Sequence, residues 1–308
     1  MPDPGLCLFQ HTDCQRHASG GWHPENPHRL AAIDQALAAD PVLRDLPRVT
    51  ASPAGRASLE RVHSARYLDA LASALPASGV VWLDNDTYMN PASLEACYGA
   101  AGAVILAVDQ VLGGDCRRAF SLVRPPGHHA GPEQPMGFCL INVAAVGIAH
   151  ALAQPGIRRV AVVDFDVHRG NGTEAIFHDD PRVLFCSGYQ EGLLPATESG
   201  SKPVALAETR FPAHAEGDAL REAWDARWAP ALAAFEPDLV FVSAGFDAHT
   251  RDPLGGLHWR DEDFGWLGER LAEFADRTCH GRLVATLEGG YEPAALKTAV
   301  PAFLRALA

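Results

Sequence analysis

Val160-Ala-Val-Val-Asp164-Phe-Asp166-Val-His168-Arg-Gly170 decides the fold of this chain. The four apolar residues at its start predict a buried strand, and three side chains that can bind a metal follow at a spacing of two. On a straight strand Asp164 and His168 would lie about 13 Å apart, at ~3.3 Å per residue, too far to share one ion. Because Gly170 and Gly172 let the chain turn, we expect Asp166 and His168 to converge as ligands, with Asp164 as a nearby supporting carboxylate.

Apolar strands and helices alternate along the rest of the chain. This alternation predicts an α/β fold with one mostly parallel sheet covered by helices on both faces. No linker-like break interrupts it, so we expect a single domain over residues 1–308. A long loop is expected at 188–213, and such loops inside compact domains are usually functional. The expected strands lie at 5–9, 119–123, 160–163, 183–187, 238–243 and 283–287, and the expected helices at 30–39, 92–112, 138–152, 173–178, 217–235, 261–277 and 292–307.

Composition narrows the classes of function. The chain has 308 residues, 47% of them hydrophobic, which is enough for a well-buried core. Its formal net charge of −13 disfavours direct binding to nucleic acid and is compatible with cationic substrates. We expect no membrane span, because we find no apolar run long enough to cross a bilayer. The seven cysteines form no Cys-x-x-Cys pair and no basic N-terminal region precedes them, so we expect reduced thiols and a cytoplasmic protein, with an oligomer left open.

Four apolar strands each run into a break in the chain and then into reactive side chains. Ligand sites in open parallel sheets lie at the carboxyl ends of the strands, so the four ends should meet at one rim. The side chains delivered there would be His128, His129, Asp166, His168, Asp247 and Tyr291. The functional prediction depends on this convergence, not on any single motif.

Each of these motifs also has a simpler interpretation. Asp164 could cap the turn after its strand, with His168 on the surface. Adjacent histidines such as His128 and His129 are often incidental, although the Pro-Pro-Gly before them lets a loop present both rings to one cavity. Asp247 could likewise cap a loop, and Tyr291 could be a half-buried core tyrosine.

The spacing His11-x-x-Cys14-x-x-His17 raises the question of a second metal site. It lacks the remaining ligands and spacing of a zinc finger. We therefore favour a packed loop near the entrance to the main site.

The residue types at the rim indicate a chemistry. Two carboxylates and one imidazole around an ion leave coordination positions open, which is the layout of catalytic zinc. Such an ion lowers the pKa of bound water to about 7 and polarises a carbonyl group. A neutral histidine nearby can take the proton of that water, and a phenol can stabilise the oxyanion. Together these groups predict hydrolysis of an amide or ester.

The motifs resemble those of the zinc-dependent histone deacetylase family, which includes bacterial deacetylase-like amidohydrolases and acetylpolyamine amidohydrolases. The resemblance spans nearly the whole chain, and the Asp-Pro-Leu-Gly-Gly and Leu-Glu-Gly-Gly-Tyr segments are similar to the class II branch. It implies the arginase–deacetylase fold. The matching segments are 23–29, 124–131, 137–139, 164–172, 243–256 and 287–291.

The resemblance also implies a role for each matching residue. One zinc ion would be held by Asp166, His168 and Asp247. His129 would act as general base and then general acid, His128 backed by Asp164 would orient the water, and Tyr291 would donate to the carbonyl oxygen. The acyl-lysine tunnel would be lined by Gly137, Phe138, Leu194, Gly289 and Gly290. A structural potassium ion would lie near Asp164, Asp166, His168 and Ser187.

Two positions depart from common patterns of the family. Asn171 stands where many relatives place an Asp beside the second histidine, so His129 should be less basic. Leu194 falls at a tunnel wall that is often aromatic, and a non-aromatic wall would widen the tunnel.

We expect a deacetylase that acts on N-acyl-lysine in proteins or peptides. An acetylpolyamine amidohydrolase is the main alternative, and Leu254 offers no acid where some polyamine-preferring relatives carry one. A manganese ureohydrolase would need more bridging carboxylates and a different motif order. An inactive acyl-lysine binder would normally have lost Tyr291 or a ligand.

Overall fold

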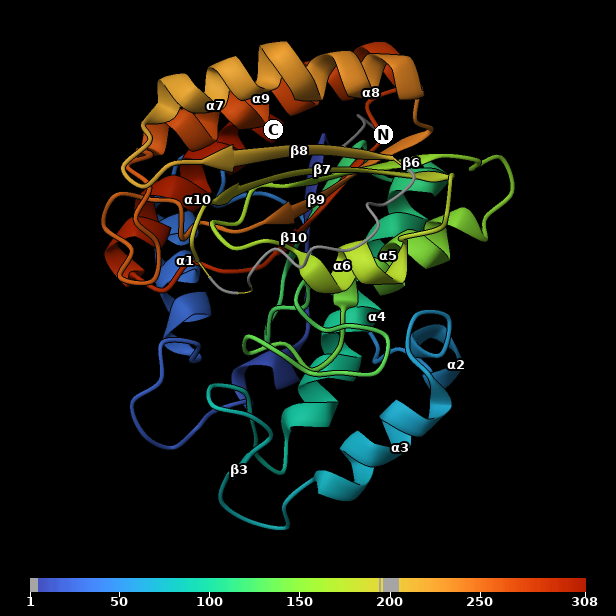
Figure 1. Cartoon of the computed structure of the whole chain (residues 1–308), viewed down its shortest axis with the longest axis vertical. Helices are drawn as coiled ribbons and strands as arrows, with labels where there is room; N and C mark the ends of the chain where they lie inside the picture. Colours follow the sequence, from blue (N-terminus) through green and yellow to red (C-terminus); the bar gives the residue numbers. More distant parts are fainter. Residues whose placement is uncertain (1–4, 194, 196–204) are drawn as a thin grey trace.

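The computed structural model describes residues 5–193, 195 and 205–308. Within these residues, eight strands form one sheet in which every neighbouring pair is parallel, in the order β2-β1-β5-β10-β9-β6-β7-β8 (Figure 1). The strands are β1 (Leu6–Gln10), β2 (Arg48–Thr50), β5 (Arg118–Leu122), β6 (Val160–Asp164), β7 (Val183–Gln190), β8 (Leu206–Phe211), β9 (Leu239–Ala244) and β10 (Leu283–Leu287). The predicted parallel sheet is confirmed.

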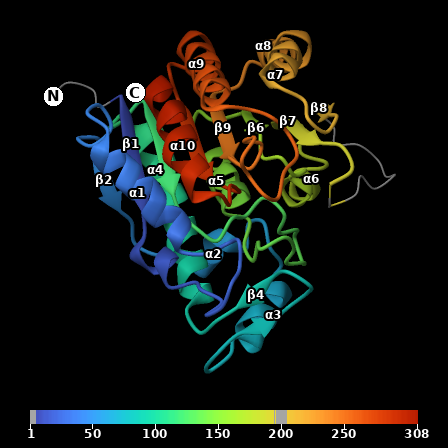
Figure 2. The ribbon, with the colours of Figure 1, turned by 90° about the vertical axis from the view of Figure 1, so that its left-hand side faces the viewer.

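Helices cover both faces of this sheet (Figures 1 and 2). On one face, α4 (Ser93–Gly113) and α5 (Val143–Leu152) contact the central strands. On the other face, α9 (Asp261–Thr278) and α10 (Pro293–Leu307) pack together, and α1 (His28–Ala39) packs on α10. Phe303 of α10 contacts the rings of Phe120 and Phe165. The central strands are therefore buried on both sides, which is why they are continuously apolar.

The register places the reactive segments at one rim. Asp164, the last residue of β6, lies level with Ser187 of β7 and Ser243 of β9. Leu287 at the end of β10 lies level with Ala244 at the end of β9. All neighbouring strands run in the same direction, so the segments that follow them emerge at the same edge.

The structure corrects three expected elements. The expected helix 138–152 begins only at Val143, because Gly137 and Phe138 have φ values of 53° and 69° and the Asn142 side chain caps Ala145 N. The expected loop 188–213 contains the end of β7 and all of β8, which pair over six residues. The expected helix 217–235 is interrupted by a π-helical turn at Trp224–Trp228, between α7 (Gly217–Ala223) and α8 (Ala229–Phe235).

Several short elements were not expected from the sequence. They are the helices α2 (Arg56–Leu59) and α3 (Ala65–Ala74), the edge strand β2, the two-stranded sheet of β3 (Val81–Trp82) and β4 (Tyr88–Met89), and the short 3-10 helix Thr12–Gln15. Of these, α2, α3 and β3 lie in the lower part of the molecule in Figure 1, away from the helices α7–α9. The helix α6 (Asn171–Ile176) follows β6 close to where it was expected.

The expectation about apolar runs was also wrong in one respect. Among the described residues, α4 is long and apolar enough to cross a membrane by length and composition alone. However, 61% of its most apolar window is buried inside the protein. Helix α4 contacts β1, β5, β10 and α5, so its apolar surface is used for packing the core.

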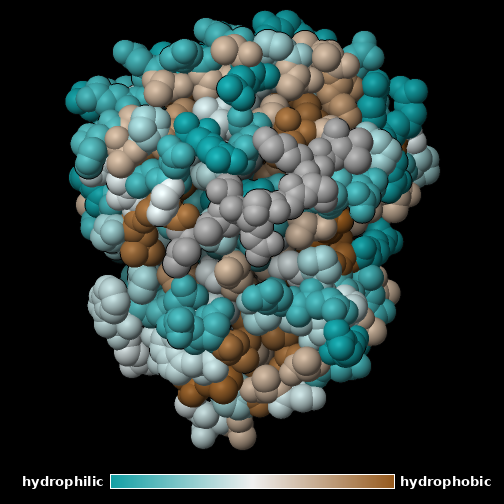
Figure 3. Space-filling view, viewed as in Figure 1, coloured by the Kyte–Doolittle hydropathy of each residue, from teal (hydrophilic) through white to brown (hydrophobic). Residues whose placement is uncertain are grey.

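The surface differs from this core. The face seen in Figure 3 is mostly hydrophilic, with apolar side chains gathered in small patches. All seven cysteines are buried and free of disulfide bonds, as expected for reduced thiols.

Candidate functional site

Three potential metal ligands meet at the rim of the sheet. Asp166 and His168 lie in the loop after β6, and Asp247 lies in the loop after β9. One ligand atom from each lies within 4.8 Å of the other two. His168 Nδ1 is 3.0 Å from Asp166 Oδ1 and 3.1 Å from Asp247 Oδ2. Among the described residues, no other group of three or more His, Cys, Asp or Glu side chains is placed to share an ion.

Backbone groups hold the two carboxylates in place. Val167 N donates to Asp247 Oδ1 at 2.9 Å, and Gly289 N donates to Asp166 Oδ2 at 2.8 Å. Gly289 must be glycine, because a Cβ there would lie 2.1 Å from Asp247 Oδ2. The β10 loop therefore packs directly against the ligand group.

The chemistry of this donor set fits a divalent cation. Two buried carboxylates face a single imidazole, which leaves an excess of negative charge in a low-dielectric site. Burial opposes charging of His168, but Asp166 and Asp247 outweigh it and raise the pKa of this imidazole well above its usual value. A cation would balance the same two carboxylates, and an Asp, His, Asp set with open positions is typical of catalytic zinc.

The tandem histidines lie beside this group, and each has its own partner. His128 Nδ1 is 3.0 Å from Asp164 Oδ2, and His129 Nδ1 is 2.8 Å from Asn171 Oδ1. The two rings are 4.0 Å apart between centroids. His128 Nε2 lies 3.8 Å from Asp166 Oδ2, which places this histidine against the ligand group.

The environment shifts the pKa values of the two histidines in opposite directions. Burial opposes charging of His128, but Asp166 and Asp164 outweigh it and raise its pKa to about 10. Burial and the neighbouring His128 and His168 lower the pKa of His129 well below its usual value. One imidazole therefore carries a charge at neutral pH, and the other is neutral and able to accept a proton.

Tyr291 follows β10 and is held by aromatic and cationic neighbours. Its ring lies 5.4 Å from the ring of Phe138, edge to face, and the Arg29 guanidinium lies 4.8 Å from its centroid. Arg29 also donates to the carbonyl oxygens of Glu288 and Gly290. Burial raises the pKa of the Tyr291 phenol well above its usual value, so the phenol stays protonated and can donate a hydrogen bond.

The described residues expected to line the tunnel lie next to these groups. Gly137 packs on His129, where a Cβ would lie 2.5 Å from the imidazole. Phe138 contacts His23, at 4.8 Å between ring centroids, as well as Tyr291. Gly290 has a φ of 113°, and a Cβ there would lie 2.9 Å from Leu296 Cδ2 and 3.0 Å from Phe246 Cβ. Leu194 lies outside the described residues.

The expected monovalent-cation site comprises Asp164, Asp166, His168 and Ser187. Ser187 is buried, and its Oγ has no hydrogen-bond partner. Asp164 and Ser187 are register partners on neighbouring strands. An unpaired buried hydroxyl oxygen on the strand next to Asp164 is compatible with a bound cation.

The residues of the His11-x-x-Cys14-x-x-His17 pattern do not share a site. His11 Nδ1 accepts from Asp13 N, and the Cys14 thiol donates to Ala96 O. His17 is 2.7 Å from Ser93 Oγ and stacks on another ring. This segment is a packed loop, as favoured from the sequence.

The sequence reasoning missed a buried ion network beneath Tyr291. Arg124 donates to both carboxylate oxygens of Glu25, each at 2.6 Å, and Arg29 lies 3.3 Å from the same carboxylate. All three side chains are almost completely buried. Burial opposes the charge of Glu25, but Arg124, His17 and Arg29 outweigh it and lower the pKa of this carboxyl to about 2. The only signal in the sequence was an arginine placed directly after a strand.

Replacing Glu25 by Gln should destabilise the protein by about 3–5 kcal/mol, because two buried guanidinium groups would lose their counter-charge. The pKa is lowered from 4.5 to about 2, so this carboxylate stabilises the fold above pH ~4.5 and loses its contribution as the pH falls toward 2. Urea unfolding between pH 3 and 7 measures both effects.

Glu95→Gln is the matched control, since Glu95 forms an exposed pair with Arg16 and should contribute little. A Glu25→Gln protein as stable as the Glu95→Gln protein at pH 7 would contradict this account of the network.

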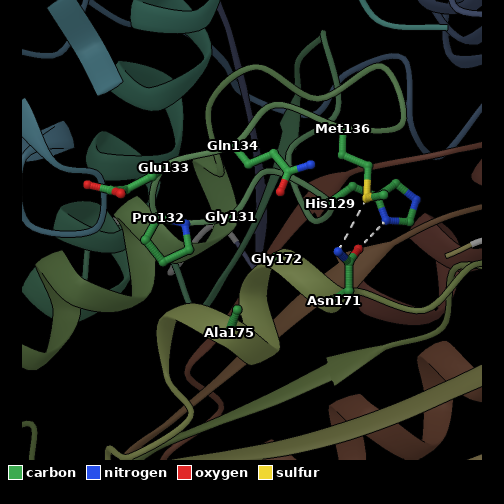
Figure 4. A pocket seen from close by; sticks show the side chains of 9 residues that line it. All are labelled: His129, Gly131, Pro132, Glu133, Gln134, Met136, Asn171, Gly172 and Ala175. Carbon is green, nitrogen blue, oxygen red and sulfur yellow. Dashed lines mark hydrogen bonds between the residues drawn. The ribbon is translucent and has the colours of Figure 1, made fainter. Parts of the chain in front are cut away.

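A cavity of about 520 Å³ lies on the outer side of the His129–Asn171 pair. Figure 4 shows the Asn171 amide facing His129 and Met136, with both contacts drawn. Pro132 and Ala175 form apolar parts of the wall. The hydrogen-bonded pair therefore borders this cavity as well as the ligand group.

Comparisons with known proteins agree with this geometry. The sequence profile of the histone deacetylase domain matches residues 23–307. The histone deacetylase-like amidohydrolase of Pseudomonas aeruginosa is 38% identical, with 89% of this chain and 76% of that protein aligned. A probable deacetylase of Methanothermobacter thermautotrophicus is 39% identical, with 92% of this chain and 86% of that protein aligned.

A solved structure supports the fold. The crystal structure of the HDA15 HD domain superposes with a TM-score of 0.89 and 30% identity, covering 98% of this chain and 89% of that one. The expected arginase–deacetylase fold is thereby confirmed. The chain belongs to the histone deacetylase family, which includes deacetylases and related amidohydrolases.

Proposed function

We propose that this protein is a zinc-dependent deacetylase that removes acetyl or other acyl groups from N-acyl-lysine in proteins or peptides. The observation that carries the proposal is the meeting of the Asp166, His168 and Asp247 ligand atoms within 4.8 Å, directly beside the tandem histidines. Tyr291 is brought to the same rim by the loop after β10.

Zinc bound by Asp166, His168 and Asp247 would activate water and polarise the carbonyl of the scissile amide. His129 supplies the base. Asn171 Oδ1 can only accept a hydrogen bond, so the proton of neutral His129 sits on Nδ1 and Nε2 is free to take a proton from water. The same Nε2 then returns the proton to the leaving amine.

Two further groups stabilise the negative charge that develops on the carbonyl oxygen. Asp166 and Asp164 both raise the pKa of His128, and Asp164 would still do so through its contact with Nδ1 when Asp166 holds zinc, so an imidazolium at His128 would favour an oxyanion nearby. Tyr291 is a protonated phenol that donates a hydrogen bond to the same oxygen. Both groups are fixed before substrate arrives, which is what makes such stabilisation effective.

We further propose a structural potassium ion near Ser187, supported by its unpaired hydroxyl. We also propose that residues 1–308 form a single catalytic domain and that the protein is cytoplasmic. We propose that it has no direct nucleic-acid or membrane partner. The net charge of −13 supports this proposal for nucleic acid. The competing substrate class is an acetylated polyamine. The apolar Leu254, which follows Asp252-Pro253, disfavours it.

Steady-state turnover of an acetyl-lysine peptide and of acetylputrescine, with longer acyl-lysine peptides in parallel, tests the proposal. We expect the acetyl-lysine peptide to have the higher kcat/KM, with inhibition by a hydroxamate chelator. A higher kcat/KM for acetylputrescine would show that the protein is an acetylpolyamine amidohydrolase and not an acyl-lysine deacetylase. No hydrolysis of any acyl amide by the metal-loaded protein would refute the deacetylase.

Replacing Asn171 by Asp should shift the pH dependence of the reaction. A carboxylate 2.8 Å from His129 Nδ1 raises the pKa of this imidazole. His129 would then be protonated at a higher pH, so the neutral base would be lost earlier as the pH falls. The acid limb of kcat/KM should move to higher pH, as measured by initial rates from pH 5 to 9.

Asn171→Leu is the control, because it removes the hydrogen bond without adding charge. It should lower kcat/KM without moving the acid limb of the pH profile to higher pH. An acid limb that stays in place in Asn171→Asp would contradict the role of His129 as the base.

A further inference from the structure

Asp252 is a buried carboxylate that the mechanism above does not use. Its Oδ2 accepts hydrogen bonds from Tyr291 N at 2.6 Å and from Glu292 N at 3.1 Å. Its Oδ1 accepts from Leu254 N at 3.0 Å. Both oxygens are thus occupied by backbone donors, and the side chain is only 6% exposed. Such a carboxylate restrains three peptide groups at once.

The restraint joins two loops of the site. Asp252 lies in the loop after β9, five residues beyond the proposed ligand Asp247, and this loop is itself well anchored. Asp252 N donates to His249 O at 2.8 Å, and Thr250 N donates to Trp259 O at 2.8 Å. The Tyr291 backbone is therefore tied to a rigid part of the structure.

The backbone around Tyr291 requires such a restraint. Gly290, immediately before it, has a φ of 113°, a conformation that few other residues adopt, and α10 begins just after it at Pro293. Arg29 donates to the Gly290 carbonyl, directly before Tyr291, and to the Glu288 carbonyl two residues earlier. The N–H of Tyr291 points the other way and is held by Asp252. A carboxylate at the start of α10 is also favoured by the helix dipole.

We infer that Asp252 is a positioning residue for the reaction, which fixes the backbone of Tyr291 and thereby sets the place of its phenol oxygen. The inference rests on the proposed role of Tyr291. A shift of this peptide moves the phenol away from the carbonyl oxygen that it would contact, whereas Asp166, His168 and Asp247 keep the backbone donors that hold them.

Asp252→Asn tests the inference, because Asn has one acceptor oxygen in place of two and directs its NH₂ group at a backbone donor. We expect kcat to fall about 10- to 100-fold, the size of effect produced by small misplacements of a reacting group. KM should stay within about twofold and the bound metal should be unchanged, since neither depends on Tyr291 in this account.

The decisive measurement is the double-mutant cycle with Tyr291→Phe. If Asp252 acts through the phenol, Asp252→Asn should change kcat by less than about twofold in the Tyr291→Phe background. Multiplicative losses in the double variant would overturn this inference and leave the proposed function intact. Full activity of Tyr291→Phe alone would remove the proposed role of Tyr291 and overturn this inference with it, whereas the deacetylase assignment is refuted only if the metal-loaded protein hydrolyses no acyl amide.

Asp40→Asn is the matched control. Asp40 is also a buried carboxylate that accepts from two backbone N–H groups, those of Val42 and Leu43, and it also pairs with Arg305. Its replacement should lower the stability without changing kcat. An equal fall of kcat in Asp40→Asn would show that Asp252 acts only through overall stability, and would overturn the inference.

Hydrogen exchange on the unmodified protein covers the case in which Asp252→Asn does not fold. The amides of Tyr291 and Glu292 should exchange slowly, at a rate similar to that of the first turns of α10. Rapid exchange of both amides would show that Asp252 does not restrain them, and would overturn the inference.

Discussion

Replacing Asp247 by Ala should remove the bound metal and nearly all activity. Loss of the ion forfeits several kcal/mol of transition-state stabilisation, and each 1.4 kcal/mol is tenfold in rate, so kcat/KM should fall by about 10³-fold or more. Asp247 lies 3.1 Å from His168 and receives the N–H of Val167, so its removal also loosens the remaining ligands. Metal content by elemental analysis and kcat/KM should fall together.

Asp263→Ala is the control for this variant. Asp263 is a buried carboxylate of α9 that pairs with Arg221 and caps its helix. Its loss should reduce stability but leave the metal content and kcat/KM close to those of the unmodified protein. An Asp247→Ala protein that keeps both its metal and its activity would show that Asp247 is not a ligand.

Replacing Tyr291 by Phe should lower kcat by about 10²- to 10³-fold, the usual consequence of losing one oxyanion donor. The ring would keep its contacts with Phe138 and Arg29, so substrate binding should change little. The ligand group is untouched, and the bound metal should remain. Steady-state kinetics and elemental analysis of the same preparation measure all three quantities.

Tyr67→Phe is the matched tyrosine control. The Tyr67 hydroxyl is buried and donates to Leu140 O at 2.7 Å, so its removal costs stability at a position outside the proposed machinery. Tyr67→Phe should keep its kcat. A Tyr291→Phe protein with unchanged kcat would require another donor for the oxyanion.

Local sequence patterns predicted the sheet and the place of the site well, for a physical reason. A strand buried on both faces must be apolar throughout, so the six main strands were visible as short apolar runs. Because parallel strands end at one edge, the residues after them had to meet, and Asp166, His168 and Asp247 do. The edge strand β8 was not predicted because Leu206–Phe211 is mostly only half-buried and half of its residues are polar.

The missed parts of the site depend on contacts between distant residues. Glu25 and Arg124 are 99 positions apart, and Asp252 and Tyr291 are 39 apart, so no local pattern could pair them. The late start of α5 depends on Phe138, a non-glycine residue with positive φ, which holds its ring between His23 and Tyr291. Propensity favoured a helix there, and the tertiary contacts of the site override it.

The central claim is that one divalent cation is held by Asp166, His168 and Asp247. Anomalous diffraction from crystals of the active enzyme, collected on both sides of the zinc and iron absorption edges, tests it most directly. The account predicts a single peak within bonding distance of all three side chains. A fully active enzyme with no peak there, or with two neighbouring peaks that share these ligands, would contradict it.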